Sequence, residues 1–147
     1  MTATTHALIA GFIASSVPNP EIGLPMVAFS HPILDMIPHW DFGIGWRKKT
    51  KFKLFIESFF DLWVGVLITY LIFAKTTDHL YLFAAIFLSE IWDLMLIPYL
   101  LFNWKFFPFS TFYDFGHKTN RHAKLPWGII TQIASVALVA LFFRLVR

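Results

Sequence analysis

Long apolar stretches separated by short polar ones dominate the sequence. Two stretches, at about 54–74 and 79–102, are long enough to cross a bilayer as helices, which takes about 20 residues. A third, at about 126–143, is close to that length. Two earlier stretches, at about 4–17 and 22–37, would span only ~24 Å each as helices. They are therefore expected to cross a thinned bilayer or to form a re-entrant pair.

Prolines mark the limits and the middle of the second stretch. Pro18 and Pro20 separate it from the first, Pro38 ends it, and Pro32 lies inside it. Because proline lacks a backbone donor and clashes with the preceding turn, this helix is expected to be kinked or broken at Pro32. The pattern as a whole predicts an all-α integral membrane bundle of about five segments, with residues 1–147 forming a single transmembrane domain.

Composition agrees with a membrane protein. The chain of 147 residues is 57% hydrophobic and only 14% charged, whereas soluble domains carry roughly 25% charged residues. The sequence contains no cysteine, which excludes disulfides and thiolate metal sites. The net charge of +3 is small and sits in loops, a pattern typical of membrane topology rather than of nucleic-acid binding.

Basic residues gather in two loops, at 47–53 and at 103–125, which bracket the stretches at 54–74 and 79–102. The positive-inside rule predicts that both loops and the N-terminus face the cytoplasm of a bacterial-type inner membrane, with the C-terminus on the far side. No Lys or Arg precedes the apolar residues 7–17, so this stretch is interpreted as a retained helix rather than as a signal peptide.

Carboxylates and histidines interrupt the apolar stretches at helical spacings. His31 and Asp35 are four residues apart and Glu90 and Asp93 three apart, so each pair is expected on one helical face. Asp61 lies deep in the stretch at 54–74. Because a carboxylate at mid-bilayer depth costs several kcal/mol, these acids are expected to have a cation, a shared proton or a water-filled cavity as partner.

Under this topology, polar side chains from every apolar stretch except the last converge on the cytoplasmic half of the bilayer. A mixture of imidazoles and carboxylates without sulfur suits Zn, Mn, Fe or Mg, and zinc is the favoured ion. The predicted ligands of this divalent metal are His6, His31, Asp35, His39, Asp61, Glu90 and Asp93.

Other polar residues are predicted to act beside the metal. Asp41 is the expected extra base or second-metal ligand, and His117 and His122 are candidate catalytic residues. Lys118 and Arg121 would steady an anionic group such as a phosphate, or serve only as topogenic charge. A bound metal would activate water and polarise a substrate oxygen, while a carboxylate or a histidine acts as general base.

Two short motifs in the first part of the chain resemble a known family. The dipeptide TH at residues 5–6 and the pattern HxxxDxxPHxD over residues 31–41 resemble the small bacterial membrane proteins known as predicted membrane-bound metal-dependent hydrolases, the YdjM-like group. The resemblance covers mainly residues 1–45 and implies a metal site. That family's later motif resembles HRxxTHS, whereas residues 117–122 read HKTNRH, which departs in spacing and order.

These observations predict a membrane-embedded metal-dependent hydrolase that acts on a phosphoester or other lipid-associated ester at the cytoplasmic face. Its expected partners are the bilayer and a lipid substrate. A proton- or metal-ion-coupled carrier is the first alternative, because buried carboxylates can relay ions, although few polar residues lie in the far half. A non-enzymatic scaffold is the second, but no Lys or Arg lies inside the stretches that hold the acids. The oligomeric state stays open.

Overall fold

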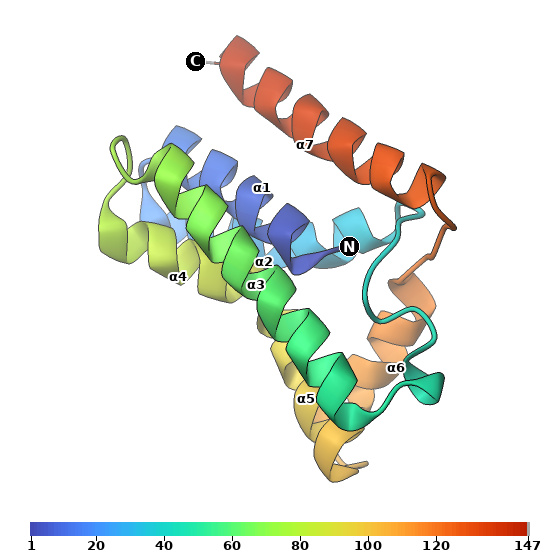
Figure 1. Cartoon of the computed structure of the whole chain (residues 1–147). Coiled ribbons are helices and arrows are strands. Elements are labelled where there is room, and N and C mark those ends of the chain that lie inside the picture. The colour runs from blue at the N-terminus through green and yellow to red at the C-terminus, as the bar shows by residue number, and fades with distance from the viewer. Residues whose placement is uncertain (147) are drawn as a thin grey trace.

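The computed structural model describes residues 1–146, which fold into helices joined by short loops and contain no strand, only one isolated bridge (Figure 1). The predicted all-α class is therefore confirmed. The elements in chain order are α1 (Ala3–Ser16), α2 (Pro20–Asp35), the 3-10 turn η1 (Trp46–Lys48), α3 (Lys51–Phe73), α4 (His79–Ser89), α5 (Ile91–Phe102), α6 (Phe109–Thr119) and α7 (Trp127–Val146).

Short polar side chains determine where the first four α-helices begin. Oxygens of Thr2, Asn19, Thr50 and Asp78 accept hydrogen bonds from backbone amides in the first turn of α1, α2, α3 and α4, respectively. These amides have no partner inside the helix, so each cap satisfies a donor that would otherwise be left open. The helix starts thus follow from the polar residues between the apolar stretches.

α2 runs without interruption through Pro25 and Pro32. The sequence predicted a kink or a break at Pro32, and the break does not occur. Val27, His31 and Leu34 are buried on the side of α2 that packs against its neighbours α1 and α4. This tertiary packing stabilises the helix despite the backbone hydrogen bonds that the prolines remove.

The stretch at 79–102, predicted as one segment, forms two helices instead. α4 and α5 meet at Glu90 and are bent by 46° relative to each other. α6 was not predicted as an element at all. It lies in the polar, aromatic region at 103–124 and packs against α5 through ring contacts such as Tyr99 on Tyr113, with centroids 4.0 Å apart.

α3 and α7 are long and apolar enough to cross a membrane, and α4 with α5 makes a third span if the bent pair counts as one. This is fewer than the five segments predicted, because α1 and α2 have only 14 and 16 residues. Side chains such as Phe60, Leu71 and Leu138 are 61%, 68% and 66% exposed. Exposed apolar surface on this scale is typical of a face that contacts lipid.

α1 lies at the centre of the molecule and contacts α2, α3, α4 and α7. Its buried Ala7, Ala10, Gly11 and Ala14 are small, which lets neighbouring helices approach closely. In Figure 1, α5, α6 and the first half of α3 project beyond the α1–α2 pair, and the C-terminal end of α7 lies at the opposite end. The start of α1 and the end of α2 therefore meet near the middle of the molecule.

Candidate metal centre

The first group of potential ligands joins the start of α1 to the end of α2. His6, His31 and Asp35 each offer one ligand atom, and these atoms lie within 4.8 Å of one another. The Nε2 atom of His6 is 3.2 Å from Oδ1 of Asp35, and that of His31 is 3.3 Å from Oδ2. All three side chains are buried. The spacing of His31 and Asp35 therefore places them on one face of α2, as predicted.

The packing around this group leaves one polar atom unsatisfied. The rings of His6 and His31 stack with their centroids 3.8 Å apart, and the amino group of Met1 lies against Oδ1 of Asp35. The buried Nδ1 of His6 has no hydrogen-bond partner among the described residues. Buried polar atoms are nearly always paired, so this nitrogen, on the side of the ring opposite the Nε2 that faces Asp35, is an exception in the packing.

The second group lies directly after α2. The Nε2 atoms of His39 and His122 are each 3.2 Å from Oδ2 of Asp41. An isolated parallel bridge aligns the two histidines, in which the amide of His39 donates to the carbonyl of Arg121 and the amide of Ala123 donates to the carbonyl of His39. The loop after α6 is thereby held against the end of α2, which brings together residues 81 positions apart.

His39 connects the two groups. Its Nε2 atom is 3.7 Å from Oδ1 of Asp35 in the first group and 3.2 Å from Oδ2 of Asp41 in the second. The side chain is completely buried. The two groups therefore form one continuous cluster of imidazoles and carboxylates, which we call the His/Asp cluster and define as His6, His31, Asp35, His39, Asp41 and His122.

Backbone carbonyls orient two of the histidine rings. The Nδ1 atom of His39 donates to the carbonyl of Ile37 at 2.8 Å, and the Nδ1 atom of His31 donates to the carbonyl of Ser89. A carbonyl can only accept, so Nδ1 carries the hydrogen and Nε2 of the neutral ring presents a lone pair. Each lone pair then faces a carboxylate oxygen, so either a second proton or a cation must lie between them. Metal-binding histidines are usually oriented in this way.

The loop residues Asp41 and His122 carry opposite charges readily. Burial opposes ionisation of Asp41, but its hydrogen bonds with His122 and His39 hold the pKa of its carboxyl well below the usual range. The same bond raises the pKa of His122 above its ordinary value. At neutral pH, Asp41 is therefore ionised and available either to a cation or to a protonated histidine.

Two further acids border the His/Asp cluster. Asp93 lies on α5 with Oδ1 3.7 Å from Nε2 of His31, and its side chain is half exposed. Glu90 is buried at the junction of α4 and α5, where its Oε1 accepts a hydrogen bond from the hydroxyl of Ser89 at 3.2 Å. The structure thus brings the predicted ligand Asp93 to the edge of the cluster, whereas Glu90 does not belong to either group.

Asp61 has a different environment from the predicted one. Its Oδ2 accepts a hydrogen bond from the amide of Ala3 at 2.7 Å, and its Oδ1 accepts from the hydroxyl of Thr4 at 2.7 Å. Both carboxylate oxygens therefore cap the N-terminal end of α1, where a negative charge is favourable. The structure does not gather Asp61 into either ligand group.

The remaining predicted residues lie outside the cluster. His117 is exposed on the last turn of α6, where its ring stacks on Tyr113 with the centroids 5.9 Å apart. The side chains of Lys118 and Arg121 are exposed on either side of the end of α6. Lys118 lies in the last turn of α6 and Arg121 directly precedes His122, and neither belongs to a ligand group.

A small pocket of about 40 Å³ opens onto the cluster between α2, α5 and α6. One water needs about 10–15 Å³, so the pocket has room for more than one. Asp35 and Asp93 line it together with the rings of Phe112 and Phe115. Asn120 also lines it, and the buried Oδ1 of that side chain has no hydrogen-bond partner among the described residues. The pocket therefore links the acids to an aromatic, partly polar entrance.

Gln132 on α7 is a supporting residue that the sequence analysis missed. Its buried Oε1 accepts hydrogen bonds from the amide of Thr2 at 2.8 Å and from the hydroxyl of Thr5 at 2.9 Å. Its Nε2 donates to the carbonyl of Trp40 at 2.8 Å. Gln132 thus ties α7 to the residues flanking both groups. The sequence signal that could have identified it is a single side-chain amide within the apolar stretch at 126–143.

The donor set suits a hard or borderline divalent ion. Each group offers two imidazoles and one carboxylate, which match the nitrogen and oxygen ligands of zinc, manganese or iron. The oriented ring of His31 fits the same conclusion. The His/Asp cluster can therefore hold a metal ion.

Comparison with known proteins adds no relative. The chain matches no protein-family model, no curated protein and no solved structure. The resemblance to the YdjM-like group thus stays a prediction from the motifs.

Proposed function

We propose that this protein is a membrane-embedded, metal-dependent hydrolase that acts on a phosphoester or other lipid-associated ester at the cytoplasmic face of a bacterial inner membrane. One observation carries the proposal. Imidazole nitrogens of His31 and His39, each with the other ring nitrogen bonded to a carbonyl, face carboxylate oxygens at 3.3 and 3.2 Å inside an apolar bundle. A cation between them removes the repulsion between these acceptors.

The residues divide into two roles under this proposal. His6, His31 and Asp35 would hold the metal, and Asp93 and His39 border these ligands at 3.7 Å from His31 and Asp35, respectively. When bound, the metal supplies a Lewis acid that activates water and polarises the ester. Asp41 and His122 transfer the protons.

Asp41 and His122 have the geometry expected of an acid–base pair. Asp41 accepts the proton of the attacking water, and His122, which is 44% exposed, returns a proton to the leaving oxygen. Lys118 and Arg121 supply positive charge for an anionic substrate near His122. Phe112 and Phe115 at the pocket entrance suit the apolar part of a lipid.

Metal content is the decisive measurement. We expect the detergent-purified full chain, reconstituted with zinc, to hold one or two equivalents by plasma mass spectrometry. Asp35→Asn and His6→Ala are each expected to lower the content at least tenfold, because loss of a mere supporting partner already costs about 10- to 100-fold in affinity. His117→Ala is the matched control, since that histidine is exposed and outside the cluster.

Activity follows from the same preparations. Zinc-loaded protein is expected to cleave para-nitrophenyl phosphodiesters or carboxyl esters. Asp41→Asn is expected to lower turnover by about 100-fold or more, while the first group keeps its metal. A wild-type chain that binds no divalent metal after reconstitution would contradict the proposal. Metal binding without hydrolysis of any ester would limit the conclusion to a metal site.

One observation favours an ion-coupled carrier as the second candidate. Glu90 is buried at the break between α4 and α5, and broken helices with buried ionisable groups are typical of secondary transporters. Uptake of zinc or protons into sealed proteoliposomes separates the two functions, because a hydrolase moves no ion across the bilayer. Transport that depends on Glu90 and persists in Asp41→Asn would favour the carrier.

A further inference from the structure

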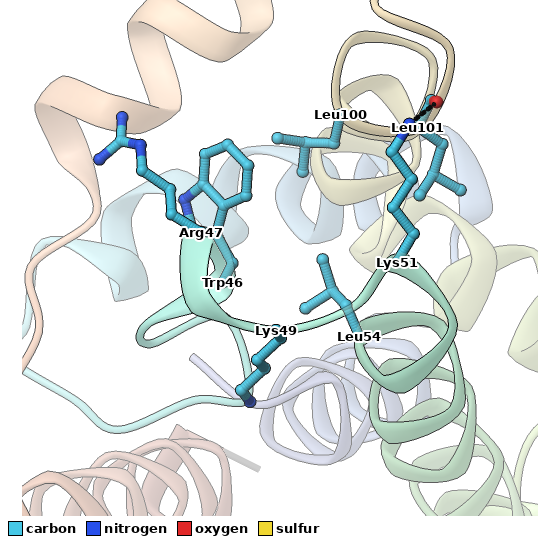
Figure 2. Close-up of a pocket in the computed structure, with 7 residues that line it drawn as sticks. All are labelled: Trp46, Arg47, Lys49, Lys51, Leu54, Leu100 and Leu101. Atoms are coloured by element: carbon cyan, nitrogen blue, oxygen red, sulfur yellow. Dashed lines mark hydrogen bonds between the residues drawn. The ribbon is translucent and has the colours of Figure 1, made fainter.

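A second hollow lies at the basic end of α3 and shares no lining residue with the His/Asp cluster. Its volume is about 220 Å³, far above the roughly 10–15 Å³ that one water needs. The turn η1, the start of α3 and the end of α5 enclose it. Its apolar side consists of Trp46, Leu54, Leu100 and Leu101 (Figure 2).

One of the three basic side chains that line the hollow already forms an ion pair with a carboxylate. The Nζ atom of Lys49 pairs with the carboxylate of Glu57 at 2.5 Å and also donates to the carbonyl of Phe42 at 2.7 Å. Figure 2 shows its side chain directed away from Leu54 and Leu100. Lys49 therefore anchors the loop that leads from the cluster to α3 and contributes little charge to the hollow.

The other two basic side chains, Arg47 and Lys51, have no carboxylate partner among residues 1–146. The Nζ atom of Lys51 donates to the carbonyl of Leu101 at 2.7 Å, across the hollow (Figure 2). The guanidinium of Arg47 lies 5.0 Å from the centroid of the Trp46 ring, and Figure 2 shows it on the side of this ring away from Lys51. Neither side chain pairs with a carboxylate of residues 1–146, and no acidic residue in that range lines the hollow. The hollow thus combines two uncompensated cations with an apolar wall.

Its position matches the boundary of a bilayer crossed by α3. Lys51 is the first residue of this span, and the adjacent Phe52 and Phe55 are 75% and 52% exposed. Aromatic rings and basic residues that flank a transmembrane helix are typical of the headgroup region. Basic residues at this level attract anionic lipids, and the guanidinium of Arg47 suits a phosphate in particular.

We infer that this hollow binds an anionic phospholipid such as phosphatidylglycerol. Lys51 contacts the headgroup phosphate, Arg47 adds positive charge beside the ring of Trp46, and the leucines accommodate the first part of an acyl chain. The inference does not depend on the proposed hydrolase activity, because the hollow and the His/Asp cluster have no residue in common.

Native mass spectrometry of the detergent-solubilised full chain tests the inference. The protein is titrated with dioleoyl phosphatidylglycerol, with dioleoyl phosphatidylcholine and with inorganic phosphate. We expect discrete complexes with phosphatidylglycerol and roughly tenfold to thirtyfold weaker binding in the Arg47→Gln/Lys51→Gln double variant. Arg47→Lys/Lys51→Arg keeps both charges and is expected to retain binding, which separates a charge effect from a folding defect.

The matched control is Lys105→Gln/Lys124→Gln, which removes the same charge from the other basic loop. Equal loss of phosphatidylglycerol in both charge-neutralised variants would show a diffuse attraction and overturn the inference. Equal binding of phosphatidylcholine would reduce the hollow to an apolar crevice. Full competition by inorganic phosphate would identify a site for free anions instead of lipid.

Discussion

At the residue scale, Asp61 has hydrogen-bond partners that compensate its carboxylate without a metal ion. The sequence placed it among the ligands because of its depth in an apolar stretch. In the folded chain, its oxygens accept hydrogen bonds from the amide of Ala3 and from the amide and hydroxyl of Thr4. Three donors and the positive end of α1 compensate the charge without any ion.

We therefore expect Asp61→Asn to lower the free energy of unfolding by about 1–2 kcal/mol, because the amide keeps the shape but loses the charge and one acceptor. Metal content is expected to stay unchanged. Glu57→Gln, on the same helix, is the control and should cost under about 1 kcal/mol, since its pair with Lys49 is partly exposed. A variant of Asp61 that unfolds like wild type but loses its metal would restore the ligand role.

At the element scale, the start of α7 and the segment after α2 approach each other most closely at Gly128. The amide of Trp40 donates to the carbonyl of Gly128 at 3.2 Å. A Cβ atom on Gly128 would lie 2.4 Å from the nitrogen of Trp40 and 2.8 Å from the carbonyl oxygen of Ala123. Trp40 lies between His39 and Asp41, and Ala123 follows His122, so this contact positions the whole second group.

Gly128→Ala is accordingly expected to destabilise the protein by about 1–3 kcal/mol, because backbone atoms rather than flexible side chains must move. The control is Gly116→Ala on α6, where the nearest atom would be 3.9 Å away. Alanine favours the helix by about 1 kcal/mol over glycine, so that variant should be neutral or stabilised. Thermal unfolding in detergent measures both, and equal stability of the two variants would show that the contact at Gly128 can relax.

At the scale of the whole molecule, the arrangement of helix ends agrees with the distribution of charge. The side chain of Lys51, the first residue of α3, donates to the carbonyl of Leu101 near the end of α5. The basic loop at 47–53, which leads into α3, and the basic loop at 103–125, which follows α5, therefore lie at the same end of the molecule. The turn at Lys75 follows the other end of α3. A span by α3 therefore separates Lys75 from both loops.

Single-cysteine labelling tests this topology directly, because the native chain has no cysteine. In inner-membrane vesicles of known orientation, Lys48→Cys and Lys105→Cys are expected to react with an impermeant maleimide from the cytoplasmic side. Lys75→Cys is expected to react only from the opposite side. Labelling of Lys48→Cys and Lys75→Cys from one side would mean that α3 lies along the membrane rather than across it.

The sequence by itself determined the features that depend on neighbours within a few positions. Apolar run length predicted α3 and α7, and the spacing of His31 and Asp35 predicted their common face. The ligand chemistry, imidazole and carboxylate without sulfur, was also fixed at that level.

Only the tertiary structure decided which polar residues meet. His122 reaches Asp41 because the loop after α6 pairs with the segment after α2, and Asp61 reaches α1 because α1 packs on α3. Gln132 joins three segments that are remote in sequence. These contacts form between segments whose relative placement depends on the packing of the whole bundle, and no local period or spacing encodes that placement.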